Sequence, residues 1–540
     1  MMTGDITLVS DVVRRSATLW PDRIAVQNAD GSMRLTYAEL WREVERGAVT
    51  LRSRGLLSGD RVLLALDASP DWIVAFLAIA HAGLVAVPIP STTSATLVRL
   101  VAMHARIRVG IANRANSWLE SALTGLTFMT PADLAAPEEA PDRPGFQPVG
   151  KRDAGTVAVL VFTSGSTTRP RAVALSHAAL RANLRALEAV RSPEPGETVL
   201  STLPPSHAYE LVAGQLAPLA AGARIVYAGA LLPNRLIETI RTQAVTRMML
   251  VPALLDMLVR AVIDRLASVD RGGVASPECR TLTAAGLADR VRALGMTERG
   301  RLRHAIRAEI GDAFIVATLG GAASDPAWTA VLDAAGVAID VGYGLTEAGP
   351  VVTMGRAGDC PAGSVGRALP GVEIRVADDG EILVRSQSIM EGYAGDADAT
   401  AAALVEGWLQ TGDRGRLDAD GFLFIQGRIK EAMVTSAGET IYPDEIEPAY
   451  GSPLFTDVAI VPMPDDRGND VPTLVVVPAS TPHAKHVDAI RAEVGRLRAA
   501  APARLRVQRF VLRSELPRSA AGKIRRRALA DELRPHEVLQ

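Results

Sequence analysis

Short apolar runs alternate with longer helical patterns through most of the first 420 residues of this chain. Four such runs are rich in valine, isoleucine, leucine or methionine: RVLLAL at 61–66, VAVLVF at 157–162, ARIVYAG at 223–229 and RMMLVP at 247–252. A chain that alternates strands with helices in this way folds into α/β layers. Its 540 residues exceed the ~250–300 residues that one hydrophobic core supports, so we expect two or more domains.

The longest apolar stretch, WIVAFLAIAHAGLVAVPIP at 72–90, is about long enough to cross a membrane. His81 and Gly83 interrupt it, and it divides into a helical pattern ending near Gly83 and a short strand pattern, LVAVPI. We therefore expect a buried helix followed by a core strand, and no transmembrane segment. The N-terminus lacks the features of a secretory signal.

Charge and cysteine content exclude several classes of function. The formal net charge is −2, which gives no basic field for binding nucleic acid. The two cysteines, Cys279 and Cys360, have neither metal-ligand spacing nor a partner pattern, so we expect no disulfide framework and no zinc site. These features together predict a cytoplasmic protein.

The pattern changes twice along the chain. The proline-rich, polar segment 133–155 reads as a connection. From about Arg375, Asp-Gly turns lie between short alternating strands, which predicts a small β subdomain ending near Gly427. Beyond it, strands such as DVAIVP and TLVVVP mix with helices, one of them near 487–499. We place the boundary between Gly427 and Arg428, giving domains 1–427 and 428–540, with no fused carrier domain.

One loop, FTSGSTTRPRA at 162–172, carries the chemistry expected of a polyphosphate site. Hydroxyls, exposed amides and cations suit phosphate oxygens, although the Walker pattern is absent. Alone, the loop would be better explained as a Ser/Thr-rich surface turn. The residues we assign to ATP here are Thr163, Ser164, Gly165, Ser166, Thr167, Thr168 and Arg171.

A second motif, GYGLTE at 342–347, suits the metal and the base of a nucleotide. The carboxylate of Glu347 is a hard donor for Mg²⁺, Thr346 can reach a phosphate, and the ring of Tyr343 can lie against adenine. A turn followed by a helix start is the alternative. The small residues whose backbone can approach the ligand closely are Gly320, Gly321, Ala322, Gly342 and Gly344.

Three further stretches each hold one candidate side chain. In TGD at 411–413, Asp413 can accept from two ribose hydroxyls, and Arg428 can donate to the same sugar. In PRSAAGK at 517–523, Lys523 can neutralise charge at an α-phosphate, although a solvated lysine is commoner. In LPPSHAYE at 203–210, His207 suits a pocket or gate position without proton transfer.

The order and spacing of these stretches resemble the adenylate-forming (AMP-binding) superfamily of acyl-CoA synthetases, luciferases and peptide-synthetase adenylation domains, over nearly the whole chain. The HxxE spacing from His207 to Glu210 resembles the long-chain fatty acyl-CoA synthetase and acyl-carrier-protein ligase branch. The chain departs from the family loop at Thr168, Arg171 and Ala172, where glycine, lysine and glycine are usual. Arginine keeps the charge of lysine but not its geometry.

The resemblance implies a large α/β N-terminal domain of layered sheets and helices with a small β subdomain, followed by a small mobile α+β domain. It implies ATP and Mg²⁺ as cofactors, with Lys523, Glu347, Thr346 and His207 at the reacting groups. It also implies a hinge at Lys430, about which the C-terminal domain turns to remove Lys523 and admit a pantetheine thiol.

Three functions remain open. The first is a ligase that joins a medium- or long-chain fatty acid to CoA. The second is an acyl-AMP ligase that loads a fatty or aryl acid onto a separate acyl carrier protein; the short run from Pro350 to Gly363 leaves no obvious room for the insertion typical of that branch. The third is a degenerate nucleotide-binding protein. Residues 501–527 hold nine Arg or Lys and one Glu, which suits an anionic partner or a solvated basic face.

Overall fold

The structure is a computed structural model. The residues that it describes are 7–113, 116, 118–135, 153–163, 170–229, 231–268, 284–321, 326–434, 440–464, 470–479, 484–502, 505–518 and 524–533.

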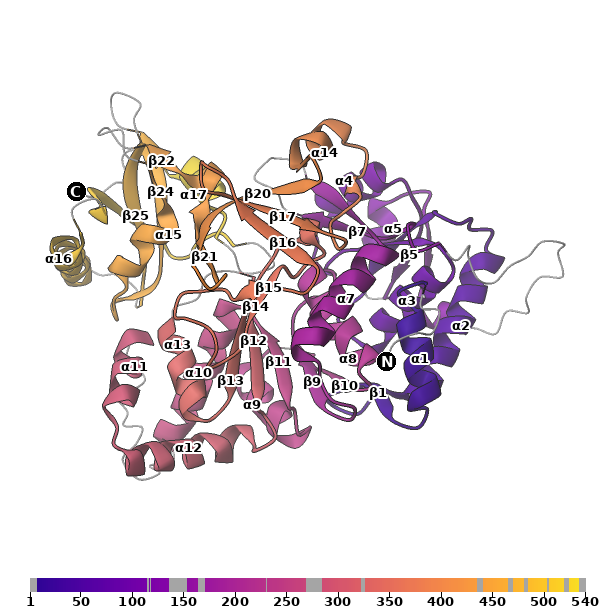
Figure 1. The fold of residues 1–540 in the computed structure, drawn as a ribbon, viewed down its shortest axis with the longest axis horizontal. Helices are drawn as coiled ribbons and strands as arrows, with labels where there is room; N and C mark the ends of the chain where they lie inside the picture. Colours follow the sequence, from indigo (N-terminus) through magenta and orange to yellow (C-terminus); the bar gives the residue numbers. More distant parts are fainter. Residues whose placement is uncertain are drawn as a thin grey trace.

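Two large, mainly parallel sheets form the body of residues 1–427 (Figure 1). The first has nine strands in the order β15 (Arg367–Ala368), β14 (Thr353–Gly355), β13 (Ala338–Tyr343), β12 (Val316–Leu319), β11 (Arg247–Leu250), β9 (Thr198–Ser201), β10 (Arg224–Tyr227), β1 (Ile24–Asn28) and β2 (Arg34–Thr36). The second has seven strands in the order β18 (Gly392–Tyr393), β8 (Arg171–Ser176), β7 (Val157–Thr163), β4 (Val85–Pro88), β3 (Arg61–Ala65), β5 (Ile107–Ala112) and β6 (Thr127–Met129). All four apolar runs singled out in the sequence are strands of these sheets.

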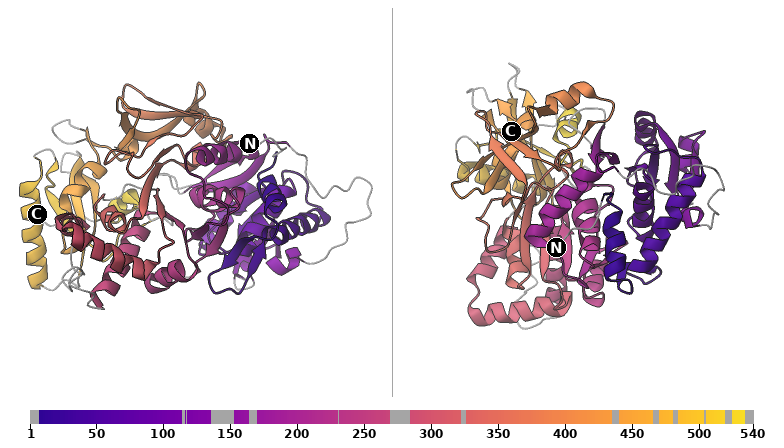
Figure 2. Two further views of the ribbon diagram at one scale, coloured as in Figure 1. Left: turned by 60° about the horizontal axis from the view of Figure 1, so that its bottom comes forward. Right: turned by 45° about the vertical axis from the view of Figure 1, so that its right-hand side comes forward.

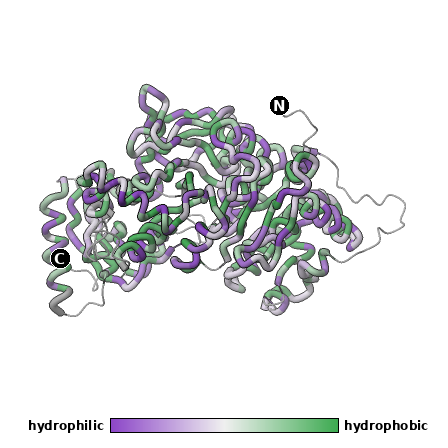
Figure 3. The backbone as a smooth tube through the Cα atoms, turned by 90° about the horizontal axis from the view of Figure 1, so that it is seen from below, coloured by the Kyte–Doolittle hydropathy of each residue, from purple (hydrophilic) through white to green (hydrophobic). Residues whose placement is uncertain are grey.

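Helices cover the two sheets and link their parallel strands, as a parallel sheet requires. Those of the N-terminal part are α1 (Asp11–Leu19), α2 (Tyr37–Ser53), α3 (Pro70–His81), α4 (Ala95–Ala105), α5 (Trp118–Ala122), α6 (Pro131–Ala135), α7 (His177–Arg191), α8 (Ala217–Ala220), α9 (Pro233–Thr242), α10 (Pro252–Ser268), α11 (Ala284–Ala293), α12 (Met296–Ile310), α13 (Pro326–Ala334) and α14 (Ala397–Ala403). Buried apolar residues of the strands and of the helices against them form common clusters. Figure 3 shows apolar and polar stretches alternating along the chain.

The apolar stretch at 72–90 forms a buried helix and a core strand, as predicted. Ser69 caps α3 by accepting from the amide of Trp72, and Pro70 opens the helix where no amide donor is needed. Trp72 and Phe76 are fully buried and stack at 5.4 Å. None of the helices in the described part of the chain combines the length and apolar character that a bilayer span requires.

The prediction that segment 133–155 holds no regular element is wrong at its start, because residues 133–135 belong to α6 (Pro131–Ala135). Thr130 and Asp133 cap this helix: the Asp133 carboxylate accepts from the Thr130 amide at 2.7 Å, and Thr130 Oγ1 accepts from the Asp133 amide at 3.2 Å. Residues 136–152 lie outside the described residues.

A smaller antiparallel sheet follows, as the Asp-Gly turns predict. It consists of β16 (Val372–Val376), β17 (Glu381–Ser386), β20 (Trp408–Leu417), β19 (Leu404–Val405) and β21 (Leu423–Arg428).

The last part of the chain lies at one end of the molecule (Figures 1 and 2). Its elements are the strand pair β22 (Met433–Val434) and β23 (Thr440–Ile441), the sheet of β24 (Phe455–Pro464), β25 (Asp470–Pro478) and β26 (Arg509–Leu512), and the helices α15 (Pro443–Ile446), α16 (Ala484–Ala500) and α17 (Arg526–Glu532). Its buried apolar residues form clusters of their own that begin at Met433, whereas the clusters of the N-terminal part end at Leu423. Among the described residues, no apolar cluster contains buried residues from both sides of Gly427.

Candidate active site

The predicted phosphate loop connects two adjacent strands of the seven-stranded sheet. β7 and β8 pair antiparallel, and Thr163 lies directly opposite Arg171 at the end of the ladder. The strand register therefore places a threonine and an arginine opposite each other at the base of the loop. Ser164, Gly165, Ser166, Thr167 and Thr168 lie outside the described residues.

Arg171 is linked to Glu347 by a side chain that the sequence analysis missed, Tyr393. The Arg171 guanidinium lies 5.0 Å from the centre of the Tyr393 ring, and the Tyr393 hydroxyl donates to Glu347 Oε1 at 3.0 Å. Tyr393 arrives on β18, which pairs with β8, and the Met390 amide donates to the backbone carbonyl of Glu347 at 2.9 Å. The phosphate-loop arginine and the expected Mg²⁺ ligand thus belong to one cluster.

Burial and the neighbouring Glu347 carboxylate raise the pKa of Tyr393 to about 12. The phenol therefore stays protonated at neutral pH and holds the carboxylate as a hydrogen-bond donor. Tyr393 lies in the two-residue strand Gly392–Tyr393. This strand is too short to show the alternation of apolar and polar residues from which a strand is predicted.

A second cluster joins Tyr343, Asp413 and Arg428. The Tyr343 hydroxyl donates to Asp413 Oδ2 at 2.7 Å, and Arg428 Nε lies 3.1 Å from Asp413 Oδ1. Asp413 and Arg428 are cross-strand partners on β20 and β21, so the strand register sets their separation. Asp413 is nearly buried, whereas the Arg428 side chain is half exposed. Burial and the Asp413 carboxylate raise the pKa of Tyr343 well above its ordinary value.

The predicted small residues stand where larger ones would collide. A Cβ on Gly344 would lie 1.9 Å from the Pro350 carbonyl oxygen, and one on Gly342 would lie 3.3 Å from the Thr353 carbonyl oxygen. A Cβ on Gly320 would lie 3.2 Å from the ring of Tyr209, and Gly321 has φ +87°. Ala322 lies outside the described residues.

The side chain of Tyr209 packs beside Gly320 and is held there by a hydrogen bond. Its hydroxyl donates to the Thr318 carbonyl at 3.0 Å, on the strand that leads into Gly320. His207 precedes it in the same turn and is half-buried. Tyr209 therefore lies beside Gly320, one of the small residues predicted to let backbone approach the ligand closely.

Glu210 opens a π-helix, Glu210–Leu216, and is fully buried. Its Oε1 accepts from Ser201 Oγ at 2.7 Å and from Gln215 Nε2 at 2.9 Å, while Oε2 has no hydrogen-bond partner among the residues that the structure describes. Burial raises the pKa of Glu210 to about 7, against the opposing effect of those two hydrogen bonds. Gly214 makes room for the carboxylate, since a Cβ there would lie 2.5 Å from it. π-helical turns are rare and often mark functional sites.

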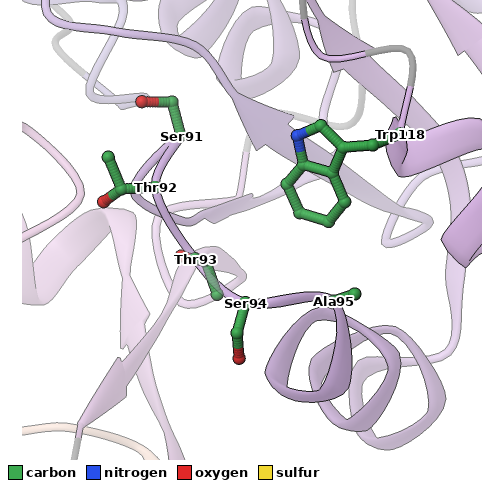
Figure 4. Close-up of a pocket in the computed structure, with 6 residues that line it drawn as sticks. All are labelled: Ser91, Thr92, Thr93, Ser94, Ala95 and Trp118. Atoms are coloured by element: carbon green, nitrogen blue, oxygen red, sulfur yellow. The ribbon is translucent and has the colours of Figure 1, made fainter.

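Of the remaining predicted residues, Thr346 lies with Glu347 in the 3-10 turn Thr346–Ala348. Lys430 lies exposed in the 3-10 turn Ile429–Glu431, directly after the β subdomain. Lys523 lies outside the described residues. A surface pocket of about 310 Å³ between β4 and α4, lined by hydroxyl side chains and Trp118, contains none of the predicted residues (Figure 4).

The donor set near Glu347 suits Mg²⁺ carried by a nucleotide. Within the described ranges, no group of three or more His, Cys, Asp or Glu side chains could hold a metal ion. Mg²⁺ is usually held by one or two carboxylates together with substrate phosphates, rather than by a cage of protein ligands. Glu347, linked through Tyr393 to Arg171 at the base of the predicted phosphate loop, fits that manner of binding.

A scan against protein-family models matches residues 13–394 to the AMP-binding enzyme family. The chain belongs to this family. The match spans both large sheets, and it confirms the predicted family and the adenylate-forming type of enzyme.

The curated relatives differ in the acids that their names specify. A feruloyl-CoA synthase of Amycolatopsis sp. is 30% identical, with 86% of this chain and 87% of the relative covered. An indoleacetate–CoA ligase of Aromatoleum aromaticum is 28% identical, with 96% of each chain covered. A fatty acid–[acyl-carrier-protein] ligase, MmaC, of Mycobacterium marinum is 29% identical, with 94% of each covered.

Solved structures share the fold over nearly the whole chain. The o-succinylbenzoate-CoA synthetase MenE of Bacillus subtilis superimposes with a TM-score of 0.78, covering 97% of this chain and 98% of that one at 20% identity. This confirms the predicted adenylate-forming fold.

Proposed function

We propose that this enzyme activates a medium- or long-chain fatty acid with ATP, forming an acyl-adenylate, and transfers the acyl group to the thiol of CoA. A carboxylate resists attack because its charge repels nucleophiles and oxide is a poor leaving group. Adenylation removes both obstacles, since the adenylate is neutral at the acyl carbon and AMP leaves readily.

The proposal rests on the two side-chain clusters described above, whose chemical groups match the different parts of a nucleotide. Arg171, Tyr393 and Glu347 gather a cation and a metal-binding carboxylate at the phosphate loop. Asp413, supported by Tyr343 and Arg428, offers a carboxylate to the two hydroxyls of a ribose. The complex of ATP with Mg²⁺ carries phosphates, a divalent cation and a ribose, so one ligand would engage both clusters.

The roles of the other residues follow the family pattern and are part of the proposal. Thr163 and the loop 164–168 would hold the phosphates, and Thr346 would contact the α-phosphate. Glu347 would hold Mg²⁺, which would supply positive charge to offset that of the leaving pyrophosphate. The acid lies beside Gly320, Tyr209 and His207. Lys523 steadies the oxygen that attacks the α-phosphorus.

We further propose that residues 428–540 form a domain that turns about Lys430 between the two half-reactions. The separate apolar clusters on either side of Gly427 support this division, because within the described part of the chain no shared core has to be broken when the domain turns.

A carrier-protein acceptor is the second candidate. It is favoured by the fatty acid–[acyl-carrier-protein] ligase among the relatives and by the basic segment 501–527. An aryl acid is the corresponding alternative for the substrate, favoured by the feruloyl and indoleacetate ligases.

The deciding experiment is carboxylate-dependent ATP–pyrophosphate exchange with straight-chain, hydroxylated and aromatic acids, with AMP release scored with CoA, with a phosphopantetheinylated carrier protein and with neither. Exchange with a fatty acid and AMP release stimulated by CoA is the expected result. Stimulation by the carrier protein alone would move the proposal to the second acceptor. ATP binding without exchange for any acid would leave a degenerate nucleotide-binding protein.

A further inference from the structure

Arg526, the first residue of α17, gathers three carboxylates from two different parts of the C-terminal segment. Its guanidinium lies 3.0 Å from Glu431, 2.8 Å from Asp444 and 2.8 Å from Glu447. The Arg526 side chain is only 14% exposed, so these contacts are largely shielded from solvent. A shielded, multiply bonded arginine holds its geometry far better than an exposed ion pair.

The three carboxylates differ in where they sit relative to the hinge. Asp444 is in α15 (Pro443–Ile446), and Glu447 is in the 3-10 turn that follows it, where its Oε1 also accepts from the Ile460 amide at 2.8 Å. Both belong to the body of the C-terminal segment. Glu431, by contrast, directly follows Lys430 in the short turn that leaves the β subdomain.

Resting on the proposed function, we infer that Arg526 is a positioning residue whose ion pair with Glu431 fastens the hinge turn to the body of the C-terminal domain. Rotation about Lys430 then moves the turn and the domain as one rigid unit. The half-reactions depend on this because the domain has to stop at two defined orientations.

Arg526 directly follows a short antiparallel pair formed by residues 517–518 and 524–525, called the stem below. Arg518 and Ile524 form an antiparallel bridge, the Arg525 amide donates to the Pro517 carbonyl at 2.7 Å, and Arg518 pairs with Asp457 on β24. The stem is therefore fixed to the domain body on one side and, through Arg526, to the hinge turn on the other.

A matched pair of variants separates this link from plain stabilisation of the domain. Glu431→Gln and Asp444→Asn each remove one negative charge from the same arginine, and the two side chains are similarly exposed, at 31% and 36%. Only the first interrupts the contact with the hinge turn. A domain-stabilising role for Arg526 would make the two variants alike.

The test compares both full-length variants with the unaltered chain by hydrogen–deuterium exchange of peptides covering 428–434, by thermal melting and by the rates of the two half-reactions. We expect Glu431→Gln to raise exchange in those peptides and to lower both rates roughly tenfold, within the range seen for directly coupled pairs, without moving the melting temperature. Asp444→Asn should change the hydrogen–deuterium exchange of those peptides and the two rates by less than about twofold.

Equal effects of the two variants, or unchanged hydrogen–deuterium exchange in Glu431→Gln, would overturn the inference. Hydrogen–deuterium exchange can be measured whether or not the enzyme turns over. A chain inactive with every acid therefore contradicts the proposed function, while the exchange comparison still decides the role of Arg526.

Discussion

At the scale of single residues, Asp413 joins the two strands of the β subdomain to Tyr343 of the nine-stranded sheet. Replacing it by asparagine removes the charge that would strengthen hydrogen bonds from ribose hydroxyls. Such a bond contributes roughly 1.5–3 kcal/mol, so we expect Asp413→Asn to raise the KM for ATP by about 10- to 100-fold.

Tyr343→Phe is the matched control for this prediction, because it keeps the ring and the carboxylate and removes only the hydroxyl that supports Asp413. It should raise the KM for ATP less than Asp413→Asn does. Steady-state kinetics at saturating acid measure both variants, and an unaltered KM in a folded Asp413→Asn enzyme would remove Asp413 from the ribose site.

Glu210 gives a pH-dependent prediction. Its pKa is about 7 in the folded protein against an ordinary value of 4.5. The folded state therefore holds the proton more tightly, and the residue makes unfolding easier as pH rises from about 4.5 through 7. The shift corresponds to about 3 kcal/mol. Relative to Glu210→Gln, which cannot ionise, the unaltered chain should lose that amount of its free energy of unfolding between pH 4.5 and 8.

Denaturant unfolding at several pH values measures this difference, and groups common to both proteins cancel in it. A constant offset across the range would mean that Glu210 stays ionised throughout, held by a partner that compensates its burial.

At the scale of elements, the turn after β13 depends on the absence of a side chain. A Cβ on Gly344 would lie 1.9 Å from the Pro350 carbonyl oxygen, and a backbone atom cannot move aside cheaply. We expect Gly344→Ala to destabilise the protein by about 1–3 kcal/mol, as overpacking does, and to weaken ATP binding by displacing Thr346 and Glu347.

Gly342→Ala is the control, since its nearest contact would be 3.3 Å from the Thr353 carbonyl oxygen. Differential scanning calorimetry and ATP titration compare the two variants. Equal melting temperatures would show that the turn can open without cost.

The sequence predicts the positions of the strands well, but it predicts poorly which distant side chains come into contact. RVLLAL, VAVLVF, ARIVYAG and RMMLVP become β3, β7, β10 and β11 because continuous apolar runs have few other places to be buried. The motifs single out Tyr343 and Asp413 separately, and the structure brings their side chains together. Sequence reasoning does not find Tyr393, because its position depends on β18 pairing with a strand far earlier in the chain.

At the scale of the whole molecule, the two proposed half-reactions make different demands on Lys523. Lys523→Ala should slow adenylation by on the order of 10²–10³-fold, the typical cost of losing one charge-stabilising group. Transfer from supplied acyl-adenylate to CoA should continue, because the proposed rotation removes the lysine before that step. Rapid-quench assays of each half-reaction measure the split. Equal loss in both, in a folded variant, would contradict the alternation of domains.

The strand β18 also governs how this chain can be divided. It covers the outer edge of β8, the strand that begins with Arg171, and it delivers the Tyr393 hydroxyl to Glu347. An expressed fragment that stops before residue 392 would expose the apolar β8 as a free edge, where it would invite pairing with other copies. Chimeras with related ligases must exchange residues 162–172 and 392–393 together, or keep both, even though about 220 residues separate them in sequence.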